Sequence, residues 1–286
     1  MMVLEFLGSG KCMTIKLVVT DLDGTCLNSE KRVSVANRRA ISALHERGIM
    51  VAIATGRMDK SIWSLARDLK IDLPLISSNG ALVRDMHSGE IIFENPLPKP
   101  AYRKILDSCQ QANAHWIVTC GNDFIVSAPD NPRLPAVEQW NSTLAPDERV
   151  DILTTDDPYT VINSDVTVYK LVVYSQTPQF LAGLAEDFSS IEGVAPVFTD
   201  HTLLDICGAG ADKGRSVEIL ATKLGLTSDQ VMTIGDQQND MSMLSWAGLG
   251  IAMGNATDAV KAIADDVTST NDQDGLALAI QKHLLS

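Results

Sequence analysis

Four short polar motifs follow or flank apolar runs in this chain of 286 residues. They are DLDGT at 21–25, TGR at 55–57, DKG at 212–214 and GDQQND at 235–240. Ligands of open parallel sheets bind outside the carboxyl ends of the strands, so motifs at successive strand ends can meet in one site. Together the motifs supply carboxylates, a hydroxyl, a lysine and glycines that leave the backbone accessible. This combination is typical of phosphoryl transfer, which depends on positioning and charge stabilisation.

The acidic residues predict a magnesium site. Asp21 and Asp23 are two residues apart, so their side chains leave the strand end on the same side. Crowded carboxylates repel unless they share a cation or one holds a proton. Asp236 and Asp240 add a further acidic cluster from a neighbouring strand end, and carboxylates with no nearby His or Cys favour Mg²⁺ over zinc. The cation would also draw an anionic phosphate towards a chain whose net charge is −13.

The same residues suggest a reaction through a covalent aspartyl phosphate. The carboxylate of Asp21 is ionised at neutral pH and can attack phosphorus without a base. Asp23, partly protonated, would give a proton to the leaving oxygen and later take one from water. Lys213, at the start of a predicted helix, and the hydroxyl of Thr55 would contact phosphate oxygens. Arg57 could reach a substrate or form an ordinary ion pair.

Apolar runs and helical stretches alternate along both ends of the chain. Runs at 15–22, 49–56 and 73–80 are typical of strands buried on both faces. Helices are expected at 34–48, with Ser34 as N-cap, and at 59–70. The rhythm returns with strands at 203–208, 231–236 and 249–254, each followed by a helix, at 213–224, 239–246 and 256–264. The pattern predicts an α/β fold, a doubly wound parallel-sheet (Rossmann-like) core.

The middle third predicts a second domain inserted into the first. A hairpin-like segment and proline-rich pieces break the alternation from Arg84 to about Asp200. We therefore expect a core at 1–84 and 199–286, and an α+β cap at 85–198, with crossings near 84–98 and 196–202. The cap contains Tyr102, Trp116, Phe124 and Trp140, which could stack on a ligand ring but are expected to fill the cap's own hydrophobic core.

Composition limits the partners and the compartment. The acidic balance disfavours nucleic acid and anionic membrane surfaces. Five cysteines with no CxxC pattern predict reduced thiols and a cytoplasmic location. The opening segment does not read as a secretory signal, and Met13 begins a natural start, so residues 1–12 are expected to be an upstream extension or a disordered tail.

The motifs, in this order, resemble those of the haloacid dehalogenase superfamily, and the position of the insertion is similar to that of its Cof-type sugar-phosphatase branch with a type IIB cap. The resemblance implies that Asp21 is the nucleophile and Asp23 the acid/base. It implies Mg²⁺ held by the Asp21 side chain, the Asp23 main-chain carbonyl and Asp236. Phosphate would be bound by the Leu22 amide, Thr55, Gly56, Lys213 and Asn239, with Asp240 orienting Lys213. Cys26 stands where such proteins usually carry leucine, and a packing role is expected there.

These observations predict a Mg²⁺-dependent phosphomonoester hydrolase acting on a small phosphorylated metabolite, with a sugar phosphate as the favoured class. The cap would close over the core and set substrate choice. Two alternatives stay open at this level: a phosphomutase or other phosphotransferase of the same superfamily, and a non-catalytic protein that binds a phosphorylated metabolite. No oligomeric state follows from the sequence.

Overall fold

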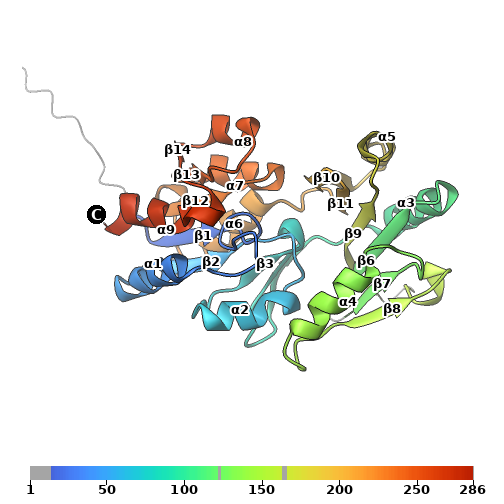
Figure 1. Ribbon diagram of the computed structural model, residues 1–286, viewed down its shortest axis with the longest axis horizontal. Helices are drawn as coiled ribbons and strands as arrows, with labels where there is room; N and C mark the ends of the chain where they lie inside the picture. The colour runs from blue at the N-terminus through green and yellow to red at the C-terminus, as the bar shows by residue number, and fades with distance from the viewer. Residues whose placement is uncertain (1–13, 122–123, 163–165, 286) are drawn as a thin grey trace, which may run out of the picture.

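Two α/β units lie side by side in the computed structural model, which describes residues 14–121, 124–162 and 166–285 (Figure 1). The question of a start at Met1 or Met13, and of a tail at 1–12, lies outside the described residues. The larger unit holds both ends of the described chain, and the smaller one is inserted between its two parts. These are the predicted core and cap.

The core sheet has five strands in the order β14-β13-β12-β1-β2, and every neighbouring pair is parallel. Their bounds are β1 Leu17–Thr20, β2 Met50–Ile53, β12 Val231–Gly235, β13 Leu249–Ala252 and β14 Asp266–Val267. A parallel bridge between Ala54 and Ile76 links the end of β2 to β3. The predicted doubly wound core is confirmed, and β1, β12 and most of β2 and β13 are buried, as the continuous apolar runs indicated.

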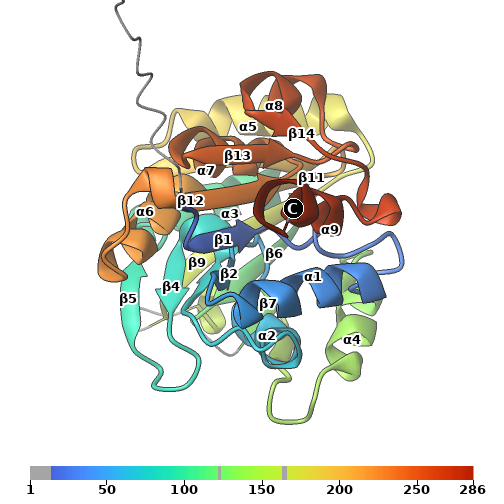
Figure 2. The same cartoon turned by 90° about the vertical axis from the view of Figure 1, so that its left-hand side faces the viewer.

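Helices cover both faces of this sheet, and the alternation of side chains along β1 shows why. Val18 packs in a cluster with α1 and α9, whereas Leu17 and Val19 pack in another cluster with α6 and α7. Figure 2 shows α6 on one side of the strands and α1 and α9 on the other. The helices of the core are α1 Val35–Glu46, α2 Trp63–Asp68, α6 Lys213–Lys223, α7 Met241–Trp246, α8 Asp258–Ile263 and α9 Gly275–Ile280.

Local signals set the ends of these helices. The Ser34 side chain accepts a hydrogen bond from the Asn37 amide at 3.1 Å, which confirms Ser34 as the N-cap of α1. Asp212 caps α6 by accepting from the Arg215 amide at 2.8 Å, which makes Lys213 the first residue of the helix.

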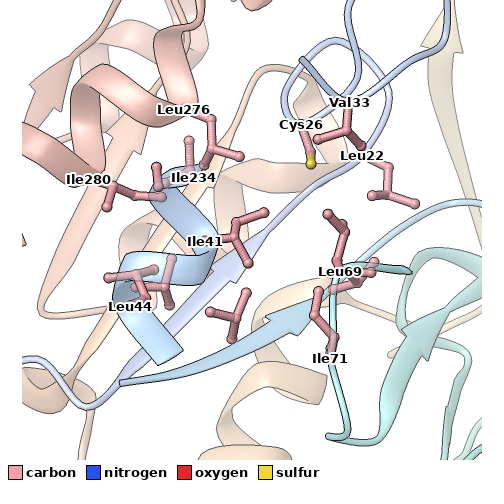
Figure 3. Close-up of a cluster of buried hydrophobic side chains, with 14 of the residues drawn as sticks. Leu22, Cys26, Val33, Ile41, Leu44, Leu69, Ile71, Ile234, Leu276 and Ile280 are labelled. Atoms are coloured by element: carbon pink, nitrogen blue, oxygen red, sulfur yellow. The ribbon is translucent and has the colours of Figure 1, made fainter. Parts of the chain in front are cut away.

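Cys26 lies in the loop after β1 and packs in the hydrophobic cluster that contains Val18 and residues of α1 and α9 (Figure 3). Its side chain is fully buried, and burial raises the pKa of its thiol to about 12. The predicted packing role is confirmed.

A three-stranded antiparallel sheet, β3-β4-β5, extends the core towards the cap. Its strands are β3 Leu75–Ser77, β4 Leu82–Arg84 and β5 Ile91–Glu94. Val83 and Phe93 pack in the same cluster as α6. The hairpin at 82–94 therefore belongs to the core by its packing, although the pattern of the sequence placed residue 85 in the cap.

The cap is a six-stranded sheet in the order β10-β11-β9-β6-β7-β8, antiparallel except for the parallel pair β7–β8. Its helices α3 and α5 lie on the side remote from the core, and α4 lies on the side towards it (Figure 1). The bounds are β6 His115–Cys120, β7 Phe124–Ser127, β8 Asp151–Thr154, β9 Val168–Tyr174, β10 Val194–Asp200, β11 Leu203–Gly208, α3 Lys99–Gln111, α4 Leu134–Thr143 and α5 Pro178–Ser189.

The strand at 203–208 was predicted correctly as a strand but assigned to the wrong sheet. As β11 it pairs with β9 and β10 in the cap, and the chain returns to the core between Gly208 and Lys213. An apolar run marks a buried strand, but its neighbours are chosen by tertiary contacts that the run does not encode.

Candidate active site

The polar motifs meet in a cavity of about 830 Å³ between the carboxyl ends of the core strands and the cap sheet. Asp21, Thr55 and Asp236 line it from the core, and Lys170 and Asp205 line it from the cap. A volume of this order suits a small-molecule ligand.

Asp21 lies at the floor of the cavity in a buried cluster with Lys213 and Asp240. The Lys213 ammonium donates to Asp21 Oδ1 at 2.7 Å and to Asp240 Oδ1 at 2.5 Å. Burial alone would lower the pKa of Lys213, but the two carboxylates outweigh it and raise that pKa, so the lysine stays charged. Burial raises the pKa of Asp21 well above its usual range, with repulsion from Asp240 and Asp236 adding to it and Lys213 opposing it. Asp21 and Asp240 thus share the Lys213 ammonium.

Asp236 completes the acidic cluster from the end of β12. Its carboxylate accepts hydrogen bonds from Thr25 at 2.9 Å and from the Gln237 side chain at 2.9 Å. Burial, followed by repulsion from Asp240, raises the pKa of Asp236 to about 6. The hydrogen bonds from Thr25 and Gln237 therefore do not fully compensate for the burial of the negative charge of Asp236.

The cluster fits a hard divalent cation. Oxygens of Asp21, Asp236 and Asp240 lie within 4.8 Å of one another. Asp240 is already engaged, because its Oδ2 accepts the amides of Asp236 and Gln237, both at 2.9 Å. Asp21 and Asp236 are thus the better candidate metal ligands. Burial, with repulsion from neighbouring carboxylates added, raises the pKa of both, and a bound cation would favour their ionised forms.

The loop after β1 is shaped to approach Asp236. Gly24 has φ +85°, and a Cβ placed there would lie 2.4 Å from Asp236 Oδ2. Glycine is therefore required both by the backbone conformation and by the close approach of this carboxylate.

Asp23 differs from the sequence prediction of a partly protonated acid. Arg57 donates to both of its oxygens at 2.7 Å, and Lys31 donates to Oδ1 at 2.9 Å. Burial would raise the pKa of Asp23, but these hydrogen bonds and charges together hold it well below its usual range. Asp23 is therefore ionised in this arrangement. Lys31 carries no motif signal and was not anticipated.

The predicted phosphate-binding residues lie around the same floor, except that the side chain of Leu22 points away from it. Thr55, Gly56 and Asn239 line the cavity. The Leu22 side chain points into the hydrophobic cluster of Figure 3, so only its main chain is available to a ligand. Asn239 donates to Asn79 Oδ1 at 2.9 Å, and its own buried Oδ1 accepts no hydrogen bond from the described residues.

A polar bridge that the sequence did not indicate joins this floor to the cap. Lys170 of β9 donates to the Gly56 carbonyl at 2.6 Å and to Asp205 Oδ2 of β11 at 2.9 Å. Asn79, at a left-handed turn after β3, donates to the same Asp205 oxygen at 2.9 Å. The run SSNG was visible at a strand end, but neither cap residue belongs to a recognisable pattern.

The aromatic residues of the cap do not all share one role. Tyr102 and Trp116 are buried in the cap's hydrophobic core, and Phe124 packs against it, as predicted. Trp140 differs, because it lines the cavity from α4 and packs with Ile117 and Ile125 on the opposite face of the sheet.

A doubly wound core, an inserted cap and an aspartate–lysine–aspartate cluster between them define a capped α/β hydrolase. The family model of haloacid dehalogenase-like hydrolases matches residues 18–280. The chain belongs to this family.

Curated relatives and solved structures agree with that assignment. The chain is 31% identical to phosphatase YwpJ of Bacillus subtilis, over 95% of this chain and 100% of the relative. It is 28% identical to pyridoxal phosphate phosphatase YbhA of Escherichia coli, over 96% and 100%. A haloacid dehalogenase-like hydrolase from Bacteroides thetaiotaomicron superposes with a TM-score of 0.80 at 31% identity, covering 94% and 99% of the two chains. The subclass IIB sugar phosphatase BT4131 gives 0.78 at 25% identity, covering 94% and 98%.

The predicted resemblance to this superfamily, and to its type IIB branch, is confirmed, and the protein is a phosphatase of the haloacid dehalogenase type. Within the described residues, no helix is both long and apolar enough to cross a membrane.

Proposed function

We propose that the protein is a Mg²⁺-dependent phosphomonoester hydrolase that works through a phospho-aspartate on Asp21. The observation that carries the proposal is the floor of the cavity, where the Asp21 carboxylate, held by Lys213, lies beside Asp236. Phosphatases among the relatives support the reaction class.

The side chains divide the reaction into two displacements. In the first, an Asp21 oxygen attacks phosphorus, the bond from phosphorus to the ester oxygen breaks, and Asp23 protonates the departing alcohol. In the second, Asp23 takes a proton from water, the water oxygen attacks phosphorus, and Asp21 is released with inorganic phosphate. Lys213, the Thr55 hydroxyl and the amides of Leu22 and Gly56 bind the phosphoryl oxygens throughout.

Asp21, Asp236 and the main-chain carbonyl of Asp23 would hold the magnesium ion. When bound, it supplies positive charge that offsets the crowded carboxylates and the phosphate.

Asp23 changes partners during this cycle. Its pairing with Arg57 and Lys31 keeps it ionised, which suits the second step, in which it accepts a proton. Arg57 lines the same cavity, so an arriving phosphate ester competes for its guanidinium. Release from Arg57 lets the pKa of Asp23 rise towards the value that an acid for the first step needs.

The proposed substrate is a small phosphorylated metabolite, the class that contains the sugar phosphates predicted from the resemblance. The cavity volume and the relatives' names support a small molecule. We also propose a cytoplasmic location, which is supported by the four described cysteines, all free thiols buried in the fold.

Phosphate release from a panel of phosphomonoesters tests the reaction. It is measured with magnesium, with a chelator and with Asp21→Asn, beside Asp258→Asn on the exposed face of α8 as a matched control. We expect turnover to require magnesium and Asp21 but not Asp258. Turnover that survives Asp21→Asn would exclude the phospho-aspartate, and loss of ester without equivalent free phosphate would indicate a phosphotransferase.

A further inference from the structure

Residues of the cap line part of the cavity with an apolar wall. We propose that this wall binds the leaving group of the substrate as a flat ring, so that the natural substrate is a phosphomonoester of a ring-bearing alcohol. The inference rests on the proposed function and narrows its substrate class.

The alternation of the cap strands creates this wall. Trp116 and Val118 of β6 point into the cap's hydrophobic core, whereas Ile117, between them, faces the cavity. Val172 of β9 lies opposite Ile117 in the register, and Ile125 of β7 lies opposite Thr119, two residues further along β6. All three line the cavity and belong to one apolar cluster. The sheet therefore presents apolar side chains to the ligand space, with Thr119 among them and Lys170 beside them.

Helix α4 extends the wall without closing it. All ten residues of α4 are described, and none of them is buried. Val137 and Trp140, about one turn apart, are half-buried, line the cavity and pack with the strand residues. An apolar helix face that borders a cavity stays partly wet until another group covers it. Because Asp21 lines the same cavity, the group in position to do so is the leaving group of a phosphate ester bound there.

The charged side chains that β9 and β11 add beside this wall are already engaged. Lys170 and Asp205 are bound to each other and to the core through the Gly56 carbonyl and Asn79. They are thus committed to holding the cap against the phosphate-binding floor. A polyol placed against the apolar wall would leave hydroxyl groups without partners, which disfavours it. A flat ring would cover the wall and leave its few polar substituents to Thr119 and Arg133, which also line the cavity.

The core contributes to the same apolar surface. Met58, which follows the TGR motif, is buried in the cluster with Ile117 and Ile125. The apolar wall therefore begins at the residue that directly follows the TGR motif. A methionine suits a ring ligand, because its thioether makes favourable contacts with aromatic edges.

When the leaving alcohols have similar basicity, differences in kcat/KM between esters report binding of the leaving group and not its intrinsic reactivity. We would compare kcat/KM for benzyl phosphate, glycerol 3-phosphate and glucose 6-phosphate, all of which are esters of alkyl alcohols. Trp140→Ala removes the largest part of the wall, and Trp140→Phe keeps a flat apolar group. Glu138→Ala, an exposed position on the same helix, is the matched control.

Wild type should prefer benzyl phosphate over both polyol esters by roughly tenfold or more in kcat/KM. Trp140→Ala should lower kcat/KM for benzyl phosphate by about tenfold and leave that for glycerol 3-phosphate within about twofold. Trp140→Phe should retain most of the preference, and Glu138→Ala all of it. Unchanged glycerol 3-phosphate turnover shows that each variant is folded.

Binding provides a readout without turnover. In an Asp21→Asn background, calorimetry should show that Trp140→Ala weakens benzyl phosphate but not inorganic phosphate. The apolar contact should also give benzyl phosphate the more negative heat-capacity change.

Equal or better turnover of glucose 6-phosphate, or an equal loss for all esters in Trp140→Ala, would overturn the ring-binding inference. The proposed function would still stand in that case, provided that turnover needs Asp21. Failure of wild type to hydrolyse any ester would overturn the proposed function and the inference with it.

Discussion

Asp236 provides a quantitative test of the acidic cluster. Its carboxyl has an ordinary pKa of 3.8, and burial with repulsion from Asp240 raises that pKa to about 6 in the folded protein. At about 1.4 kcal/mol per pH unit, this difference corresponds to about 3 kcal/mol. Asp236→Asn keeps the shape of the side chain and removes the charge.

The sign of the effect follows from which state ionises first. Below pH 3.8 the carboxyl is protonated in both states, and folding carries no penalty. As the pH rises, the unfolded chain ionises before the folded one, so the free energy of unfolding falls. The loss is nearly complete once the folded carboxyl ionises above pH 6. Magnesium bound to the folded state should restore stability most strongly in this upper range.

Thermal unfolding from pH 4 to pH 8, in chelator and in magnesium, measures both effects. In chelator above pH 6, Asp236→Asn should be more stable than wild type by up to about 3 kcal/mol, or roughly 6–12 °C. The two should converge near pH 4, and magnesium should raise the transition of wild type much more than that of the variant. Asp258→Asn should behave as wild type. Parallel stability curves for wild type and Asp236→Asn in chelator would refute the reasoning.

Three further substitutions test other contacts. Gly24→Ala should abolish activity and magnesium-dependent stabilisation, because a Cβ there collides with the Asp236 carboxylate. Thermal unfolding with and without magnesium checks this, and a retained magnesium-dependent shift would contradict it. Arg57→Gln should raise the pKa of Asp23 and so move the alkaline limb of the kcat/KM profile to higher pH, because the first displacement needs Asp23 protonated. A pH series on one ester measures this, and an unmoved limb would argue against the pairing. Arg67→Ala should destabilise the protein by about 3 kcal/mol, because it leaves the fully buried Glu148 of the cap without its cation. In denaturant titrations Glu148→Gln should cost less, and equal costs would contradict the explanation.

Much of the site could be predicted because its chemistry is local in sequence. Asp21, Thr55, Lys213 and Asp236 each follow a recognisable strand or begin a capped helix, and such patterns report secondary structure directly. A parallel sheet brings the ends of β1, β2 and β12 together, so the meeting of Asp21, Thr55 and Asp236 follows from topology. Lys213 follows a strand of the cap and reaches the site at the start of α6. The packing role of Cys26 followed from the family resemblance, in which this position usually carries leucine.

Other features could not be predicted, because they depend on contacts between distant segments. Strand β11 has the apolar pattern of a core strand, and only its partners β9 and β10 place it in the cap. Trp140 is a residue type that usually packs in a hydrophobic core, yet its position on α4 makes it line the cavity.

The sequence by itself determined the kinds of chemical group available and the strand ends from which they come. Only the tertiary structure decided how those groups are charged and what surrounds them. Asp23 is the clearest case: a residue in a recognisable motif is held ionised by Arg57 and Lys31, which lie 34 and 8 residues away in the chain. A pKa depends on burial and on charges within a few ångströms, and these are fixed when the chain folds. Motifs therefore predicted the reaction class, whereas the protonation state of Asp23 and the apolar wall of the cavity required the fold.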